Sequence, residues 1–256
     1  MLKQNKKLIF MWLVFFIYFF CYMTMEIDLW VLLSIWSIVL SIYLLIKLKL
    51  PSAKGIIISV VFAVLVSIAY LGVQMGLKVV IINGIIAGIP TLLCSLAIFS
   101  TMEKGYGIRI ISTDKKYAPL TSILIAIATG TILCVVNYFL MKGSNAVDFE
   151  INISRLIACL SPAIFEEIAC RAIFMAFGLY AVGKEEVTKF QQFTIWFMMC
   201  FPHTVSHGYD IVSTILLCIL FGLPFTILQR KRDITSAMIS HGLVDAVRFT
   251  IFGLGL

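Results

Sequence analysis

The chain is a succession of apolar runs, most of them close to the roughly 20 residues that an α-helix needs to cross a bilayer. The runs lie near residues 8–25, 28–46, 55–76, 79–100, 119–141, 152–180, 190–206, 212–229 and 234–254. The chain is 61% hydrophobic and only 13% charged, which excludes a soluble globular domain. Because only helices and closed barrels span membranes, and these runs have helical length, we predict an all-α polytopic membrane protein with about 8–9 transmembrane helices.

Basic residues gather in alternate connections between these runs. Most of the 20 Lys and Arg residues lie at the N-terminus or after the second, fourth, sixth and eighth runs, namely Lys3, Lys6, Lys7, Lys47, Lys49, Lys54, Lys104, Arg109, Lys115, Lys116, Lys184, Lys189, Arg230, Lys231 and Arg232. This alternation predicts a multi-pass protein of the cell membrane with a cytoplasmic N-terminus. The net charge of +7 is therefore a topology signal, and the absence of a basic, aromatic-interleaved patch argues against nucleic-acid binding. The Ile- and Lys-rich composition favours a bacterial source.

The sixth run carries two adjacent acids and a base, Glu166, Glu167 and Arg171. A charged side chain at the bilayer centre costs roughly 2.5–3.5 kcal/mol on insertion scales, so such residues indicate a functional site. Glu167 and Arg171 are spaced to pair on one helix face, whereas Glu166 points about 100° away. Pro162 predicts a kink, which at this depth lines protein or a water-filled cavity. Either Glu166 faces such a cavity, or all three residues form one packing salt bridge.

The three histidines of the chain all lie in its last quarter. His203 and His207 are four residues apart in the seventh run, a spacing that suits two imidazoles on one metal ion. His241 and Asp245 repeat this spacing in the ninth run, where Arg248 offers Asp245 another partner. Taken singly, each motif is also explained by a structural hydrogen bond or salt bridge.

The depths of these residues connect the motifs. At about 1.5 Å per residue, Glu166 and His203 lie roughly 20 Å from the inner ends of their runs, His207 somewhat deeper and His241 shallower. Since helix ends predicted from sequence shift by several residues, these depths overlap. A glutamate and histidines at one depth suit a zinc ion that activates water.

The order of these motifs resembles that of a known family of membrane proteins. Glu166-Glu167-x-x-x-Arg171, a histidine at the end of the next helix and His241-x-x-x-Asp245 resemble the CPBP family, the CAAX-protease and bacteriocin-processing proteins also called Abi. The resemblance covers roughly residues 152–254. Asp245 stands where the family often has Asn.

The middle motif departs from the family pattern. The family usually shows Phe-x-x-x-His, but Met199 stands at that spacing before His203, and Phe201 is out of register. His203 fits the depth of Glu166, whereas the string that starts with His207 resembles what often follows the family's histidine. Both histidines therefore stay candidates.

The resemblance implies an intramembrane endopeptidase that depends on glutamate and is assisted by zinc. Glu166 would be the general base, and Arg171 would neutralise and fix Glu167. Asp245 would orient a histidine or help to stabilise the oxyanion. The implied metal or water ligands are His241 with one of His203 and His207. The substrate would be a membrane-associated peptide or a lipidated protein, since relatives cleave prenylated tails or mature peptides.

The same resemblance divides the sequence. Residues 1–145 would be accessory N-terminal transmembrane helices, and residues 146–256 a CPBP-like catalytic helical core with the active site inside the bundle. The alternative is a non-catalytic scaffold or bacteriocin-immunity protein that retains the fold, which the displaced Phe201 favours. A proton-coupled carrier is a third hypothesis, against which the lack of internal repeats argues. The oligomeric state is not predicted.

Overall fold

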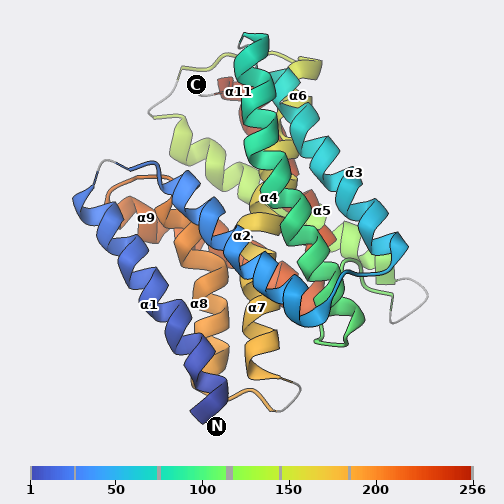
Figure 1. Cartoon of the computed structure of the whole chain (residues 1–256). Helices are drawn as coiled ribbons and strands as arrows, with labels where there is room; N and C mark the ends of the chain where they lie inside the picture. The colour runs from blue at the N-terminus through green and yellow to red at the C-terminus, as the bar shows by residue number, and fades with distance from the viewer. Residues whose placement is uncertain are drawn as a thin grey trace. The chain divides into compact units, whose positions relative to one another are not determined.

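A computed structural model describes residues 2–25, 27–73, 76–113, 118–143, 146–183 and 186–254 (Figure 1). Within these ranges the chain is helical and contains no strand, which confirms the predicted all-α class. Helices occupy all of the predicted apolar runs. Lys115, Lys116 and Lys184, which the predicted topology uses, lie outside the described residues.

The helical segments follow one another with short connections. They are α1 (Leu2–Thr24), α2 (Leu29–Leu48), α3 (Ala53–Ala69), η1 (Tyr70–Gly72), α4 (Leu77–Glu103), α5 (Ala118–Met141), α6 (Ile153–Ala158), η2 (Ser161–Glu166), η3 (Ile168–Ala172), α7 (Ile173–Val182), α8 (Lys189–Val205), α9 (Ile211–Leu217), η4 (Cys218–Gly222), α10 (Leu223–Ile227), η5 (Leu228–Arg232) and α11 (Ile234–Phe252). η1 is a 3₁₀ turn, and η2 to η5 are π-helical.

Several of these helices have the length and composition of membrane spans. Within the described ranges there are six, namely Asn5–Thr24, Leu29–Leu48, Ala53–Gly72, Leu77–Glu103, Ala118–Met141 and Ile211–Arg232. The chain is therefore a polytopic helical membrane protein. Membrane crossings by the remaining predicted runs, which carry the buried ionisable residues, stay a prediction, as does the orientation of the N-terminus.

The helices form two units. Unit 1 contains Met1–Ile56, Leu93–Ile108 and Ile168–Thr226, and unit 2 contains Ile57–Leu92, Arg109–Glu167 and Ile227–Leu256. Each unit combines segments from before and after residue 145. The predicted division into accessory helices (1–145) and a catalytic core (146–256) rests on where the motifs lie in the sequence. It stays a prediction.

In unit 1, α1 and α8 pack against each other and against α7 (Figure 1). The Trp12 ring of α1 stacks on the Phe197 ring of α8 with 4.7 Å between centroids, and its indole N–H donates to the Thr194 hydroxyl at 3.1 Å. α8 starts with a capping box, in which the Thr188 hydroxyl accepts from the Gln191 amide and the Gln191 side chain accepts from the Thr188 amide. The start and packing of α8 thus fix the helix whose last turn carries His203.

In unit 2, α11 packs along α5, and glycine permits their close approach. A Cβ on Gly130 of α5 would lie only 3.0 Å from the carbonyl oxygen of Ser240 on α11. A second contact of this kind joins α3 and α4, where a Cβ on Gly88 would lie 2.5 Å from the Ser67 hydroxyl oxygen. The small residues of both helix pairs therefore serve helix packing, as they commonly do in membranes.

The first turn of α11 is anchored by Asp233. Its carboxylate accepts from the Ser236 amide at 2.8 Å, as an N-cap does, and from the Ser112 amide at 2.9 Å and the Ser122 hydroxyl at 2.6 Å. Burial raises the pKa of Asp233, but these hydrogen bonds together outweigh it and hold the pKa below its ordinary value. The start of α11 is therefore fixed by a buried, ionised cap.

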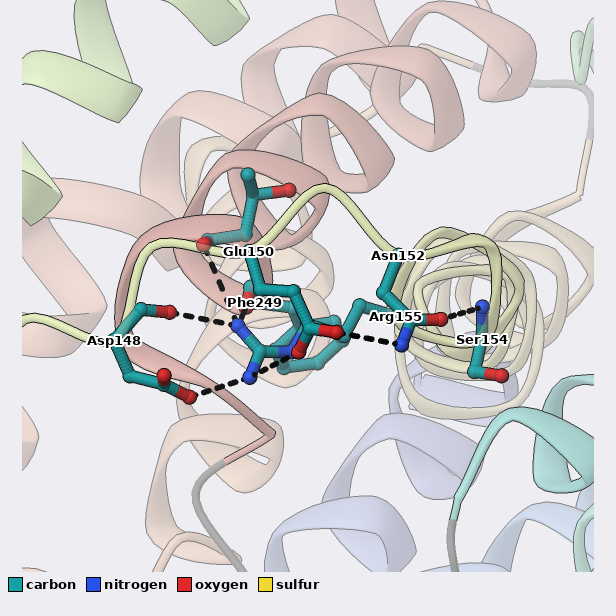
Figure 2. Close-up of polar contacts among 7 residues, drawn as sticks. Asp148, Glu150, Asn152, Ser154, Arg155 and Phe249 are labelled. Atoms are coloured by element: carbon teal, nitrogen blue, oxygen red, sulfur yellow. Dashed lines mark hydrogen bonds and ion pairs between the residues drawn. The ribbon is translucent and has the colours of Figure 1, made fainter.

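The other end of α11 is held by Arg155, as Figure 2 shows. The guanidinium donates to the carbonyl oxygen of Phe249 at 3.2 Å and to that of Asp148 at 2.7 Å. It also pairs with the Glu150 carboxylate at 3.0 Å and with the Asp148 carboxylate. Because a helix ends with unpaired carbonyl groups, a cation placed there stabilises its last turn. α11 is thus fixed at both ends, with His241 between them.

Candidate active site

The acidic residues of unit 2 lie on an irregular stretch of helix. η2 is π-helical, contains Pro162 near its start and ends at Glu166, and Glu167 follows as its cap. The kink predicted from Pro162 falls where π-helical turns replace the regular α-helix. Such turns are frequent at functional sites.

His241 of α11 is bound by Glu167. Its Nδ1 lies 2.7 Å from Glu167 Oε1, and the Glu167 side chain is fully buried. Because an ionised carboxylate can only accept, the His241 Nδ1 carries a proton and donates it. A carboxylate in this place fixes both the tautomer and the orientation of the ring. Nε2 is then the ring atom that faces the remaining groups.

Two further carboxylates of unit 2 approach this Nε2. Asp245 Oδ2 lies 3.2 Å from it and Glu166 Oε2 3.6 Å. Arg248 compensates one of these charges, since its Nε lies 3.0 Å from Asp245 Oδ1. Carboxylates on both sides of the imidazole favour a cation at Nε2, either a proton or a metal ion.

Glu167 has a second partner, Gln229, which the sequence analysis did not identify. Gln229 lies in η5, is only 3% exposed, and donates from Nε2 to Glu167 Oε2 at 2.6 Å and to the Glu167 carbonyl oxygen at 3.0 Å. His241 and Gln229 thus engage different oxygens of one carboxylate. The available signal was a single amide side chain at the end of an apolar run, which must find partners when it is buried.

In unit 1, Arg171 binds His203. Arg171 Nη2 lies 2.7 Å from His203 Nδ1, and both side chains are buried. Because a guanidinium can only donate, Nδ1 accepts and the neutral imidazole carries its proton on Nε2. The guanidinium also lies over the Phe225 ring, 5.3 Å from its centroid. His203 therefore presents an N–H donor at Nε2, which is not the form that ligates a metal through that atom.

His207 lies among aromatic rings of the same unit. Its ring stacks on Tyr209 with 5.8 Å between centroids, and the Trp30 ring makes edge contacts with His207 at 5.1 Å and with His203 at 5.5 Å. Trp30 is a second residue that the sequence analysis missed, because it lies at the start of α2, far in sequence from the motifs. The two candidate middle histidines thus differ in environment.

All of the predicted site residues lie within the described ranges. Unit 2 brings together Glu166, Glu167, His241 and Asp245, and unit 1 brings together Arg171, His203 and His207. Their assignment to catalytic and metal-binding roles stays a prediction.

The fold and these clusters define a class, a polytopic helical membrane protein with buried carboxylate–imidazole chemistry. Residues 149–247 match the family model described as type II CAAX prenyl endopeptidase Rce1-like. The match includes every predicted site residue and confirms the predicted resemblance to the CAAX-protease family in this part of the chain. No curated protein and no solved structure matches the chain.

Proposed function

We propose that the protein is an intramembrane endopeptidase that cleaves prenylated, membrane-associated peptides or proteins. One observation carries the proposal: His241, bound to Glu167 and facing Asp245 and Glu166, lies inside the range that matches the endopeptidase family. We also propose that it acts in a bacterial cell membrane, because the composition is rich in Ile and Lys. The charge alternation supports a cytoplasmic N-terminus.

The contacts support a division of roles between the two glutamates. Glu167 is engaged by His241 and Gln229, so it serves as a positioning residue. Glu166, next to the His241 Nε2, is the general base that takes a proton from water as the water oxygen attacks the peptide carbonyl carbon. The carbon–nitrogen bond then breaks, and the same proton passes to the leaving amine.

The donor form of His203 supports a role at the substrate's carbonyl oxygen. Its Nε2–H would stabilise the negative charge that develops there, and Arg171 would keep the ring in this tautomer. Asp245 would orient His241 in the same way.

We further propose a zinc ion at His241. His241 Nε2 and Asp245 Oδ2, which lie 3.2 Å apart, would hold the ion, and Glu166, 3.6 Å from the same Nε2, keeps its role as the general base. Glu167 on Nδ1 is the outer partner that zinc-bound histidines usually have. When bound, zinc lowers the pKa of a water ligand and polarises a carbonyl. His207 stays a further candidate ligand, whereas His203 does not fit while Arg171 donates to its Nδ1.

The test is cleavage in proteoliposomes of a peptide that ends in S-farnesyl-cysteine, two aliphatic residues and one further residue. Mass spectrometry is expected to detect release of the three C-terminal residues by the wild type. Glu166→Gln is expected to lower the rate by about 10²–10⁴-fold, because general acid–base catalysis contributes this much. The exposed Glu186→Gln is the matched control and should cleave like the wild type.

One result would count against this function. A wild type that is folded but cleaves neither the farnesylated nor the unmodified peptide would favour the scaffold or immunity protein. Metal analysis of the same preparations addresses zinc separately: His241→Ala should lose it and His203→Ala should retain it. Loss of zinc in His203→Ala would contradict the tautomer assigned to that residue.

A further inference from the structure

The amide of Gln229 has a fixed orientation. The two groups that it contacts, the Glu167 carboxylate and the Glu167 carbonyl, are both acceptors. Only the nitrogen of a glutamine side chain can donate to them, so Nε2 must face Glu167 and Oε1 must point elsewhere. The Oε1 position therefore follows from hydrogen-bond chemistry.

This Oε1 is a buried acceptor with no hydrogen-bond donor among the described residues. Gln229 as a whole is only 3% exposed, so bulk water does not replace the missing donor. Buried acceptors without a donor are rare because each one forfeits the hydrogen bond that it makes in the unfolded chain. An unused acceptor so close to a candidate catalytic carboxylate is the pattern expected where a ligand brings the donor.

We propose that Gln229 Oε1 accepts a hydrogen bond from a main-chain N–H of the bound peptide, and this inference rests on the proposed function. From the 2.6 Å hydrogen bond and the width of an amide group, Oε1 lies within about 5 Å of Glu167 Oε2. An extended peptide offers a regular row of N–H donors whatever its side chains. One amide group thus joins the substrate backbone to the carboxylate that orients His241.

Gln229 would therefore position the peptide by recognising its backbone rather than its side chains. A peptide held by Gln229 has its backbone aligned with the Glu167–His241 pair, and loss of the contact should weaken binding and misalign the peptide. Water is the other source of an O–H donor at this atom. The two sources differ in one respect, because only the peptide's hydrogen bond disappears when its N–H is removed chemically.

The experiment measures binding of the farnesylated peptide in detergent on a Glu166→Gln background, so that no cleavage intervenes. A series of analogues replaces one backbone N–H at a time by an ester oxygen. At one position, the ester should weaken binding to the protein that retains Gln229 by roughly 5–10-fold. The same ester should have no effect in Gln229→Met, which removes both the donor and the acceptor.

Gln229→Lys serves as the second variant, because a lysine still donates to Glu167 but offers no acceptor. It should abolish the ester effect even if Gln229→Met unfolds more readily. The proposal is overturned if no ester position weakens binding, if the ester penalty is equal with and without Gln229, or if the peptide does not bind. If the wild type cleaves the parent peptide but no ester weakens binding, the proposed function stands and only this inference is refuted. If an ester weakens binding but the wild type does not cleave the peptide, the inference stands and the proposed function is refuted.

Discussion

The two clusters that contain the predicted site residues differ in charge. In unit 2, His241 is surrounded by Glu167, Asp245 and Glu166. In unit 1, His203 accepts a hydrogen bond from Arg171 and lies against Trp30. One imidazole is therefore set in negative surroundings and the other is bound to a cation.

This difference shows that the neighbours of a buried histidine decide its chemistry. Carboxylates on both sides of His241 suit a cationic ring or a metal-bound ring, with Nδ1 as the donor to Glu167. A guanidinium on His203 requires a neutral ring with Nε2 as the donor. Under the proposed mechanism, two histidines that look alike in sequence would serve opposite functions, one holding a cation and the other stabilising a negative charge.

The largest expected effect that tests the difference between the two histidines is a loss of activity in His203 variants. His203→Ala should lower kcat by about 10²–10³-fold, because it removes one donor to the developing oxyanion. His203→Asn retains an N–H donor and should recover part of this loss. His241→Asn should recover none, because an amide does not take up a proton at neutral pH and is not a usual zinc ligand. Equal behaviour of the two asparagine variants in steady-state cleavage assays would remove the distinction.

A smaller effect on activity is expected from substitution of Arg248, which neutralises part of the negative charge around His241. Arg248→Met should lower kcat/KM by roughly 10-fold, because it leaves the Asp245 carboxylate without its partner at 3.0 Å. Adding Asp245→Asn to this variant should cost less activity than the same change costs in the wild type, because the carboxylate that lost its partner is then no longer charged. The coupling is measured with a double-mutant cycle, and additive losses in the two single variants would show that Arg248 does not act through Asp245.

The smallest effect concerns the cap of α11, outside the clusters. Asp233→Ala should lower stability by about 1–2 kcal/mol, the cost of a lost N-cap. Because its folded pKa lies below the ordinary 3.8, the ionised cap stabilises the fold above that pH. This stabilisation is lost as the pH falls through the folded pKa. Asp233→Asn retains the cap and should flatten this acid dependence in thermal unfolding scans; an unchanged profile would show that another carboxyl causes it.

The sequence predicted the fold class more completely than it predicted the contacts within the two clusters. Helices occupy all the apolar runs because their length and hydropathy alone specify helix in a membrane. The i, i+4 spacing also predicted the contact between His241 and Asp245, which is confirmed at 3.2 Å. Gln229 and Trp30 were missed, because their roles come from packing between segments far apart in sequence, which no local pattern encodes.

The bond between Glu167 and His241 illustrates the same limit. The spacing predicted a Glu167–Arg171 pair, which stays a prediction, but spacing along one helix cannot indicate a further contact with a histidine far along the chain. The long-range contact that orients His241 became visible only in three dimensions. The motif order gave the roles of the two glutamates only by resemblance to a family. The contacts of the Glu167 carboxylate oxygens with His241 and Gln229 now support its role as a positioning residue.

The most direct test of the opposite roles of the two histidines is ¹⁵N NMR of the imidazole nitrogens in protein labelled at its three histidines. Single histidine variants assign the signals, since so few are present. At neutral pH, His203 is expected to be neutral with its proton on Nε2, and His241 is expected to be protonated on Nδ1. A His203 ring protonated on Nδ1, or a His241 ring without a proton there, would contradict the account.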